Sequence, residues 1–193
     1  DLQDAMFGSK VNSVLVVLQG RDSAGKDGAI KHVVGCLNPR GVIVTSFGVP
    51  TPEERQHDFL WRVHRHAPRL GEFSIFNRSH YEDVLVVRVH DLAPKAIWQE
   101  RFGHIRGFEA LLAEHGTIVL KYFLHITKKE QEERLLEREE QPDTAWKLNP
   151  NDWKERDHWD EYTQAYEDAI SRTAAKHAPW TSVPANAKWY RNL

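Results

Sequence analysis

The chain of 193 residues is long enough for one substantial hydrophobic core and rather short for two. With 40% hydrophobic and 28% charged residues, its composition is typical of a soluble globular protein. A formal net charge of −2 gives no general attraction to nucleic acid or to an anionic membrane, so we expect neither as a partner. Positive charge that binds a polyanion must therefore be concentrated at one site.

Cysteine content and hydropathy bear on where the protein works. The single cysteine, Cys36, excludes an intramolecular disulfide and suits a reducing cytoplasm. No stretch approaches 18 uninterrupted apolar residues, and residues 1–10 lack the charged-then-apolar order of a signal sequence. We therefore expect a cytoplasmic protein. Because the first residue is Asp and not Met, an N-terminal segment could be missing.

The predicted elements begin with a buried strand. Residues 14–18 (VLVVL) form a continuous apolar run, which is typical of a strand buried on both faces. A Gly-rich loop follows, and the next residues (GAIKHVVGCL) open a helix. A second strand is predicted at 41–47 and a helix at 51–65, where Thr51-Pro52 supplies an N-cap and a first-turn proline.

The second half of the chain continues this alternation of strands and helices. Strands are predicted at 73–77, at 117–126 and, more weakly, near 181–184; helices are predicted at 94–115, 128–140 and 151–177. The alternation predicts an α/β fold with a parallel sheet of about five strands. No repeat or linker divides the chain, so residues 1–193 are predicted to form a single domain. The stretch 141–152 is the best candidate for a mobile excursion.

The loop after the first strand has phosphate-binding spacing, Gly20-x-x-x-x-Gly25-Lys26. Glycines allow backbone N–H groups to turn toward a phosphate, and the following helix presents its positive N-terminus. Lys26 is positioned to offset charge on a transferring phosphoryl group. The alternative is an ordinary tight strand-to-helix turn. The residues predicted to contact phosphate are Gly20, Ser23, Ala24, Gly25, Lys26, Asp27 and Gly28.

One position departs from the usual phosphate loop. Asp27 follows the lysine where Ser or Thr usually supplies a hydroxyl to magnesium, so other oxygens must hold the metal. Asp22, inside the loop, is the obvious replacement. Its carboxylate would repel a bound phosphate unless a cation lay between them, and we therefore assign it to metal binding.

A second group of polar residues follows the third predicted strand, in the segment IFNRSHYEDV. Side chains at the carboxyl edge of a parallel sheet face the ligand crevice, so Asn77, Arg78 and Glu82 are expected beside the loop. Asn77 and Glu82 offer oxygen ligands to a metal, and Arg78 offers a planar fork to phosphate. Taken alone, the segment also fits a capped strand-to-helix turn.

With these segments in view, the sequence resembles polyphosphate kinase family 2, whose members move phosphate between inorganic polyphosphate and nucleotides. The resemblance is carried by GRDSAGKDGAIKHV, LNPRGV, HDFLWR, FNRSHYEDVLVVRVH, WKLNPNDWKERDHWDEYTQAYEDAISRT, APW and KWYRN. It implies a P-loop kinase fold similar to thymidylate kinase with a helical lid, and a homo-oligomer (dimer or tetramer). The family's loop pattern is matched by Gly20, Asp22, Gly25 and Lys26, so the missing hydroxyl is a family trait.

Two positions suggest a subgroup within that family. Members that favour nucleoside diphosphates often carry Asp at the position of Asn77 and Asn at that of Glu82. The Asn77/Glu82 combination resembles the subgroup that accepts AMP and ADP alike.

The lid is expected at approximately residues 134–157. Arg134 and Arg138 lie four residues apart on one helical face, and on closing they could clamp phosphates and exclude water. Lys147 is a further candidate for holding nucleotide or polyphosphate. The alternative is that both arginines pair with neighbouring glutamates on a solvated helix.

The resulting hypothesis is a reversible polyphosphate-dependent nucleotide kinase, with AMP or ADP as acceptor. Asp22, Lys26 and Arg78 are the predicted catalytic residues; Asp22, Asn77 and Glu82 are predicted to hold Mg²⁺, with Mn²⁺ as an alternative. Two other hypotheses remain open. One is an ATP-dependent nucleotide or small-molecule kinase of the same fold, and the other is a non-catalytic nucleotide-binding module.

Overall fold

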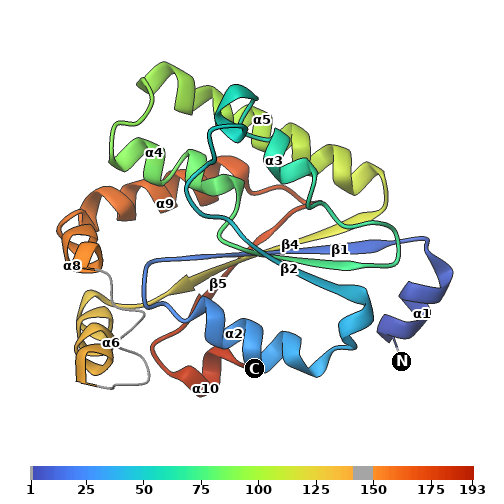
Figure 1. Cartoon of the computed structure of the whole chain (residues 1–193), viewed down its shortest axis with the longest axis horizontal. Helices are drawn as coiled ribbons and strands as arrows, with labels where there is room; N and C mark the ends of the chain where they lie inside the picture. The colour runs from blue at the N-terminus through green and yellow to red at the C-terminus, as the bar shows by residue number, and fades with distance from the viewer. Residues whose placement is uncertain (1, 141–149) are drawn as a thin grey trace.

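Five parallel strands form one sheet in the computed structural model, which describes residues 2–140 and 150–193 (Figure 1). The strands lie in the order β2–β3–β1–β4–β5, which confirms the predicted α/β class. All five predicted strands are present: β1 (Ser13–Gly20), β2 (Val42–Ser46), β3 (Phe73–Asn77), β4 (Thr117–His125) and β5 (Trp180–Pro184).

The central place of β1 follows from its sequence. It pairs with β3 on one side and β4 on the other, and its continuous apolar run allows both of its faces to be covered. All strands are parallel, so β1 and β3 end at the same edge of the sheet. The loop after Gly20 and the segment after Asn77 therefore meet at that edge.

Helices cover both faces of the sheet (Figure 1). One face of the sheet carries α3, α4, α5 and α9, and the other face carries α2 and α10. The helices α6 and α8 lie at the carboxyl edge of the sheet, and α1 lies at the opposite end. Their bounds are α1 (Leu2–Ser9), α2 (Lys26–Val33), α3 (Trp61–His64), α4 (Val86–Val89), α5 (Lys95–Glu114), α6 (Lys128–Glu140), α8 (Pro150–Asp157), α9 (Trp159–Thr173) and α10 (Lys188–Arg191). No helix in the described ranges is long and apolar enough to cross a membrane.

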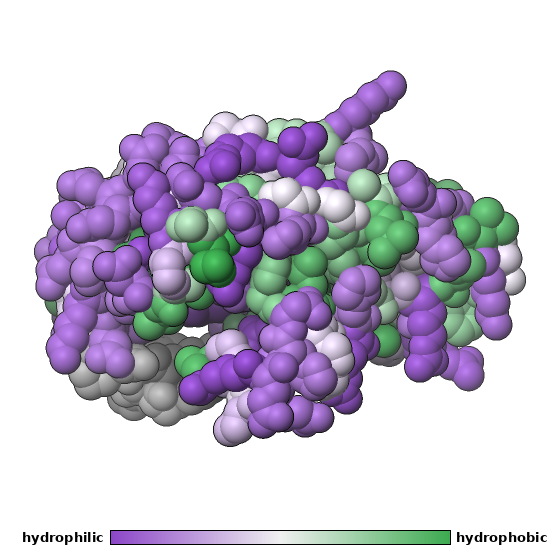
Figure 2. Space-filling view, turned by 90° about the horizontal axis from the view of Figure 1, so that it is seen from above, coloured by the Kyte–Doolittle hydropathy of each residue, from purple (hydrophilic) through white to green (hydrophobic). Residues whose placement is uncertain are grey.

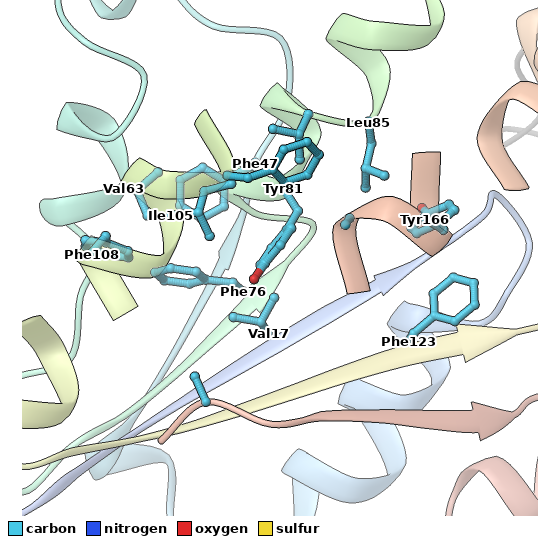
Figure 3. Close-up of a cluster of buried hydrophobic side chains, with 14 of the residues drawn as sticks. Val17, Phe47, Val63, Phe76, Tyr81, Leu85, Ile105, Phe108, Phe123 and Tyr166 are labelled. Atoms are coloured by element: carbon cyan, nitrogen blue, oxygen red, sulfur yellow. The ribbon is translucent and has the colours of Figure 1, made fainter. Parts of the chain in front are cut away.

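The main hydrophobic core lies between the sheet and α5 (Figure 3). Val17 of β1 and Phe76 of β3 face Ile105 and Phe108 of α5, and all four side chains are buried. Burying a side chain of this size contributes about 1.5–3 kcal/mol. This core fixes the strands whose carboxyl ends carry the polar segments.

A charged network is fully buried within this core. The ammonium group of Lys121 donates to Glu109 Oε2 (2.6 Å), to the Tyr81 hydroxyl (3.0 Å) and to the Thr173 carbonyl (3.0 Å). Three donors thus meet three acceptors, and the network links β4, α5, α9 and the 3₁₀ turn His80–Asp83. That turn also contains Glu82, so the buried network helps to fix the position of Glu82 at the carboxyl edge of the sheet.

Replacing Lys121 with methionine is expected to lower the free energy of unfolding by about 3–5 kcal/mol, because Glu109 would remain buried without the ammonium group that donates to it at 2.6 Å. Urea titration followed by circular dichroism measures the change. The matched control is Lys129→Met, which breaks an exposed ion pair with Glu133 and should cost less than about 1 kcal/mol. A Lys121→Met variant as stable as the control would contradict the assigned role.

The predicted helix 51–65 was wrong in its length. Thr51 forms the expected N-cap by accepting from the Glu54 N–H (3.2 Å), and the Glu54 carboxylate in turn accepts from the Thr51 N–H (2.8 Å). Only a 3₁₀ turn, Glu54–Gln56, follows. Asp58 Oδ1 then accepts from the N–H groups of Leu60 and Trp61. These two local bonds separate the 3₁₀ turn from α3.

The predicted helix 151–177 is two helices, whereas those at 94–115 and 128–140 are confirmed as α5 and α6. The chain leaves helical geometry at His158, and α9 then begins at Trp159, whose carbonyl accepts from Arg21. At the other end, Thr173 takes part in the buried network and Ala174 is extended. Long-range contacts therefore set both limits of α9.

Candidate active site

The loop Gly20–Gly28 connects β1 to α2 at the carboxyl edge of the sheet. Ser23 and Gly25 have positive φ angles of 65° and 97°, and Gly25 is the residue that caps α2. A left-handed residue beside right-handed ones turns successive N–H groups toward one side and creates a concavity that binds anions. The loop therefore has the backbone geometry of a phosphate cradle.

At two positions of the loop, neighbouring atoms lie too close to leave room for a side chain larger than that of glycine. A Cβ on Gly20 would lie 2.8 Å from the Leu124 carbonyl oxygen on β4. A Cβ on Gly28 would lie 2.7 Å from Nη2 of Arg191, whose side chain rests against the first turn of α2. These positions tolerate no larger residue without a shift of β4 or of Arg191.

Lys26 is buried within the loop, with 9% of its surface exposed. Its ammonium group donates to the carbonyl oxygens of Gly20 (2.7 Å) and Arg21 (3.1 Å). Burial lowers the pKa of Lys26, while the carboxylate of Asp22 opposes this shift. The charge is thus incompletely compensated, and an anion bound at the loop would stabilise it.

Arg78 reaches across from β3 to the loop. Its φ angle of 61° is unusual for a residue other than glycine, and such backbone strain of about 1–3 kcal/mol often occurs at functional sites. The guanidinium donates to Asp22 Oδ1 at 2.7 Å. Burial alone would lower the pKa of Arg78, but Glu82 and Asp22 outweigh burial and raise it. The two predicted segments therefore converge.

Glu82 lies beside this pair and is held by a residue that sequence reasoning missed. Gln19, in the amide orientation that satisfies both of its ends, donates to Glu82 Oε1 (3.1 Å) and accepts from the Ser79 N–H (3.0 Å). Burial raises the pKa of Glu82, whereas Arg78 and Lys26 act in the opposite direction. A polar residue as the last but one of the buried strand β1 could have indicated from the sequence that Gln19 belongs to the site.

The predicted metal ligands do not all lie together. Asp22 and Glu82 line one pocket, but Asn77 donates to Asp27 Oδ1 at 2.8 Å and to Ser46 Oγ at 3.4 Å. Within residues 2–140 and 150–193, no group of three or more His, Cys, Asp or Glu side chains could hold a metal. Two carboxylates nevertheless fit Mg²⁺, which commonly takes one or two protein oxygens and completes its coordination with water and substrate phosphate.

A pocket opens in front of these residues. Its walls come from the loop, from the segment after β3 and from the helices α4, α6, α8 and α9. They are formed by Gly20, Arg21, Asp22, Arg78, Glu82, Val86, Gln131, Glu155, Trp159, Tyr162 and Tyr166. Figure 2 shows mainly hydrophilic residues over the end of the molecule that carries α8. The pocket thus combines the guanidinium of Arg78 with the carboxylates of Asp22 and Glu82, a set that can bind a phosphorylated ligand together with a cation.

Arg21 is a second residue of the site that sequence reasoning missed. Its guanidinium lies 3.7 Å from the ring centre of Trp159 and donates to the Trp159 carbonyl (2.9 Å) and to Thr163 Oγ1 (2.5 Å). These contacts join the loop to the start of α9. Arg21 therefore helps to position the far wall of the pocket.

The family assignment follows from comparison with known proteins. A sequence profile described as Polyphosphate kinase 2 (PPK2) matches residues 1–193. The chain belongs to the polyphosphate kinase 2 family. This confirms the resemblance inferred from the sequence.

Named relatives within the polyphosphate kinase 2 family cover almost all of the chain. It is 54% identical over 191 residues to the AMP/ADP-polyphosphate phosphotransferase of Meiothermus ruber, spanning 99% of this chain and 72% of the relative. It is 43% identical over 200 residues to the ADP-polyphosphate phosphotransferase of Rhodopseudomonas palustris, spanning 97% and 69%. The Polyphosphate:AMP phosphotransferase of Pseudomonas aeruginosa is 44% identical over the whole chain, which spans 38% of that protein.

Solved structures confirm the P-loop kinase fold. The crystal structure of Polyphosphate Kinase 2 from Arthrobacter aurescens TC1 matches with a TM-score of 0.97 and 44% identity, covering 99% of this chain and 69% of that one. Deoxyadenosine kinase from M. mycoides matches with a TM-score of 0.50 and 16% identity, covering 92% and 94%, which shows likeness of fold alone.

Arg134 was expected to face the bound phosphates as part of a lid, but in this polyphosphate kinase 2 chain it lies behind the phosphate loop. Its guanidinium is buried behind the loop and donates to the carbonyl oxygens of Ser23 (2.9 Å), Ala185 (2.6 Å) and Asn186 (2.8 Å). Its Nε donates to Glu130 at 2.7 Å. With these donors occupied, Arg134 supports the back of the loop in this structure and does not face the pocket.

The remaining lid predictions are only partly within the described residues. Arg138 of α6 lies 3.7 Å from Asp152 of α8, so the two helices are joined by an ion pair. Arg156 of α8 makes a second such link to Glu132 at 2.6 Å. Lys147 lies outside the described residues. The lid at 134–157 therefore stays a prediction.

Proposed function

We propose that this protein transfers phosphoryl groups reversibly from inorganic polyphosphate to nucleoside monophosphates and diphosphates, converting AMP to ADP and ADP to ATP. The observation that carries the proposal is the convergence of Lys26, Asp22 and Arg78 at the phosphate loop of a polyphosphate kinase 2 family chain. The names of its relatives support both polyphosphate as donor and AMP or ADP as acceptor.

The chemistry is a direct displacement. A terminal phosphate oxygen of the acceptor attacks the terminal phosphorus of polyphosphate, the bond to the bridging oxygen breaks, and the donor leaves one phosphate shorter. The transition state is loose, so positioning and electrostatics supply most of the acceleration. Lys26 and Arg78 offset charge on the transferring group and on the leaving oxygen, and no covalent enzyme intermediate is needed.

Asp22 and Glu82 are the side chains that would hold Mg²⁺, or Mn²⁺ in its place. Both line the pocket and both present oxygen ligands. When bound, the ion would supply positive charge that offsets the negative charge of the substrate phosphates. Asn77 contacts Asp27 in this structure, and its part in binding metal would require its side chain to move.

The acceptor range is part of the same proposal. The chain carries Asn77 and Glu82 in the combination that suggests use of both AMP and ADP. The 54% identical relative from Meiothermus ruber is named an AMP/ADP-polyphosphate phosphotransferase, which supports this choice. We also propose a cytoplasmic homo-oligomer that binds neither nucleic acid nor membrane; light scattering during size-exclusion chromatography tests the oligomeric state.

The deciding experiment supplies long-chain polyphosphate, Mg²⁺ and either AMP or ADP, without ATP. Formation of ADP from AMP, and of ATP from ADP, is expected and can be followed by anion-exchange chromatography. Reactions without polyphosphate correct for disproportionation of ADP. Phosphorylation that appears only when ATP is the donor would favour an ATP-dependent kinase, and absence of turnover with either donor would favour a binding module.

A further inference from the structure

Arg191 lies against the phosphate loop although it is close to the C-terminal end of the chain. Figure 1 shows α10, which ends at this residue, beside α2. A Cβ placed on Gly28 would be 2.7 Å from Nη2 and 3.2 Å from Nη1 of Arg191, and a Cβ on Gly25 would overlap Nη1. The guanidinium therefore rests on the two glycines that flank Lys26.

The guanidinium of Arg191 is held by a neutral group. Asn192 Oδ1 accepts from its Nε (3.0 Å) and Nη2 (2.8 Å), and no carboxylate among the described residues forms an ion pair with it. Burial and the nearby charge of Arg134 lower the pKa of Arg191. Within the part of the chain that the structure describes, Arg191 is therefore a cation held only by a neutral amide, and such a group can bind an anion.

Buried hydrogen bonds hold the segment that leads to Arg191 against the phosphate loop. Arg134 binds the loop through the Ser23 carbonyl and the segment before α10 through the carbonyls of Ala185 and Asn186. One buried side chain thus joins the phosphate loop to the segment that leads into α10. Glycine at 25 and 28 then leaves room for the flat guanidinium.

The position of Arg191 relative to Lys26 suggests what it binds. Lys26 serves the phosphoryl group that is transferred, and the N–H groups of the first turn of α2 serve the phosphates behind it. Polyphosphate carries a further anionic group at every step along the chain. A guanidinium beside the first turn of α2 can bind such a phosphate with two parallel hydrogen bonds.

We propose that Arg191 binds the polyphosphate donor beyond the phosphoryl group that is transferred. This inference rests on the proposed function and adds a donor-binding residue to it. It separates the two substrates, because the pocket in front of Asp22 and Glu82 is left to the acceptor and the metal.

The test compares Arg191→Ala with Lys188→Ala, which removes the same charge from an exposed position on the same helix. Loss of a charged hydrogen bond should raise the KM for polyphosphate about tenfold or more in Arg191→Ala, with the KM for ADP within about twofold of wild type. Arg191→Lys should recover part of the loss, and Lys188→Ala should behave as wild type. Equal rises in both KM values, or a polyphosphate KM equal to that of Lys188→Ala, would overturn the inference.

A second variant guards against a merely structural effect. Gly28→Ala keeps the charge of Arg191 but places a methyl group where the guanidinium lies, so it should also raise the KM for polyphosphate. If both changes act through the same contact, the Gly28→Ala/Arg191→Ala pair should be no worse than the more affected single variant. Fully additive effects would contradict the proposal.

Binding measured without turnover keeps the two proposals apart. Isothermal titration of polyphosphate into the protein, in EDTA and without nucleotide, should show weaker binding for Arg191→Ala than for Lys188→Ala. If wild type binds polyphosphate through Arg191 but makes no ATP, the proposed function fails and this inference stands. If wild type makes ATP and Arg191→Ala binds polyphosphate as well as wild type does, the inference fails and the function stands.

Discussion

Lys26→Ala is expected to reduce kcat by at least about a thousand-fold, because it removes a preorganised cation from the transferring group. The wild-type ammonium already lies inside the loop, held by the carbonyls of Gly20 and Arg21, so it needs little reorganisation when substrate binds. The substitution deletes a buried charge whose pKa is lowered by burial, and the strands on either side of the loop are untouched. Loss of turnover should therefore occur in a folded protein.

Three measurements make this expectation decisive. Coupled assays of ATP formation give kcat, and circular dichroism spectra with thermal melting establish that the variant is folded. Lys31→Ala is the matched control, since it removes an exposed lysine from the same helix, and it should retain wild-type kcat within about twofold. Activity of folded Lys26→Ala near that of the control would refute the catalytic assignment.

The sheet could be predicted because local sequence determines much of it. The apolar side chains of the run VLVVL in β1 point to both faces of the sheet, so the strand is stable only where both faces are covered. The glycines after it mark the turn into α2. Parallel strands end at a common edge, so the topology predicted from the sequence already places Asp22 and Arg78 near each other. The ion pair between them, at 2.7 Å, is the direct outcome.

The contacts that Arg134 and Asn77 make in this structure involve distant segments and could not be predicted from the sequence. Arg134 looked like a lid residue because of its helical spacing, but the return of the chain after β5 brings the carbonyls of Ala185 and Asn186 within its reach. Asn77 looked like a metal ligand because it ends β3, yet the first turn of α2 offers it the carboxylate of Asp27. Spacing along the sequence shows which side chains reach the edge, and it does not show which of them bind one another.

Asp22→Asn is expected to lower kcat by about a thousand-fold and to raise the Mg²⁺ concentration needed for half-maximal activity, because an amide is a weaker ligand for a hard cation than a carboxylate. The amide oxygen can still accept from Arg78, so the contact across the site is retained in shape. The comparison is Asp4→Asn, on α1 at the other end of the sheet, which should leave both quantities unchanged.

The Mg²⁺ dependence separates two roles that the geometry allows for Asp22. If the carboxylate served only to orient Arg78, then Asp22→Asn would lose less activity than Arg78→Ala, because its amide oxygen still accepts from Arg78. The double variant would then be no worse than Arg78→Ala alone, and half-saturation by Mg²⁺ would stay at the wild-type value. If Asp22 holds the metal, half-saturation shifts in Asp22→Asn and not in Arg78→Ala. The second outcome is expected because Glu82, a second carboxylate, lines the same pocket, and two carboxylates beside a phosphate cradle repel the substrate unless a cation lies among them.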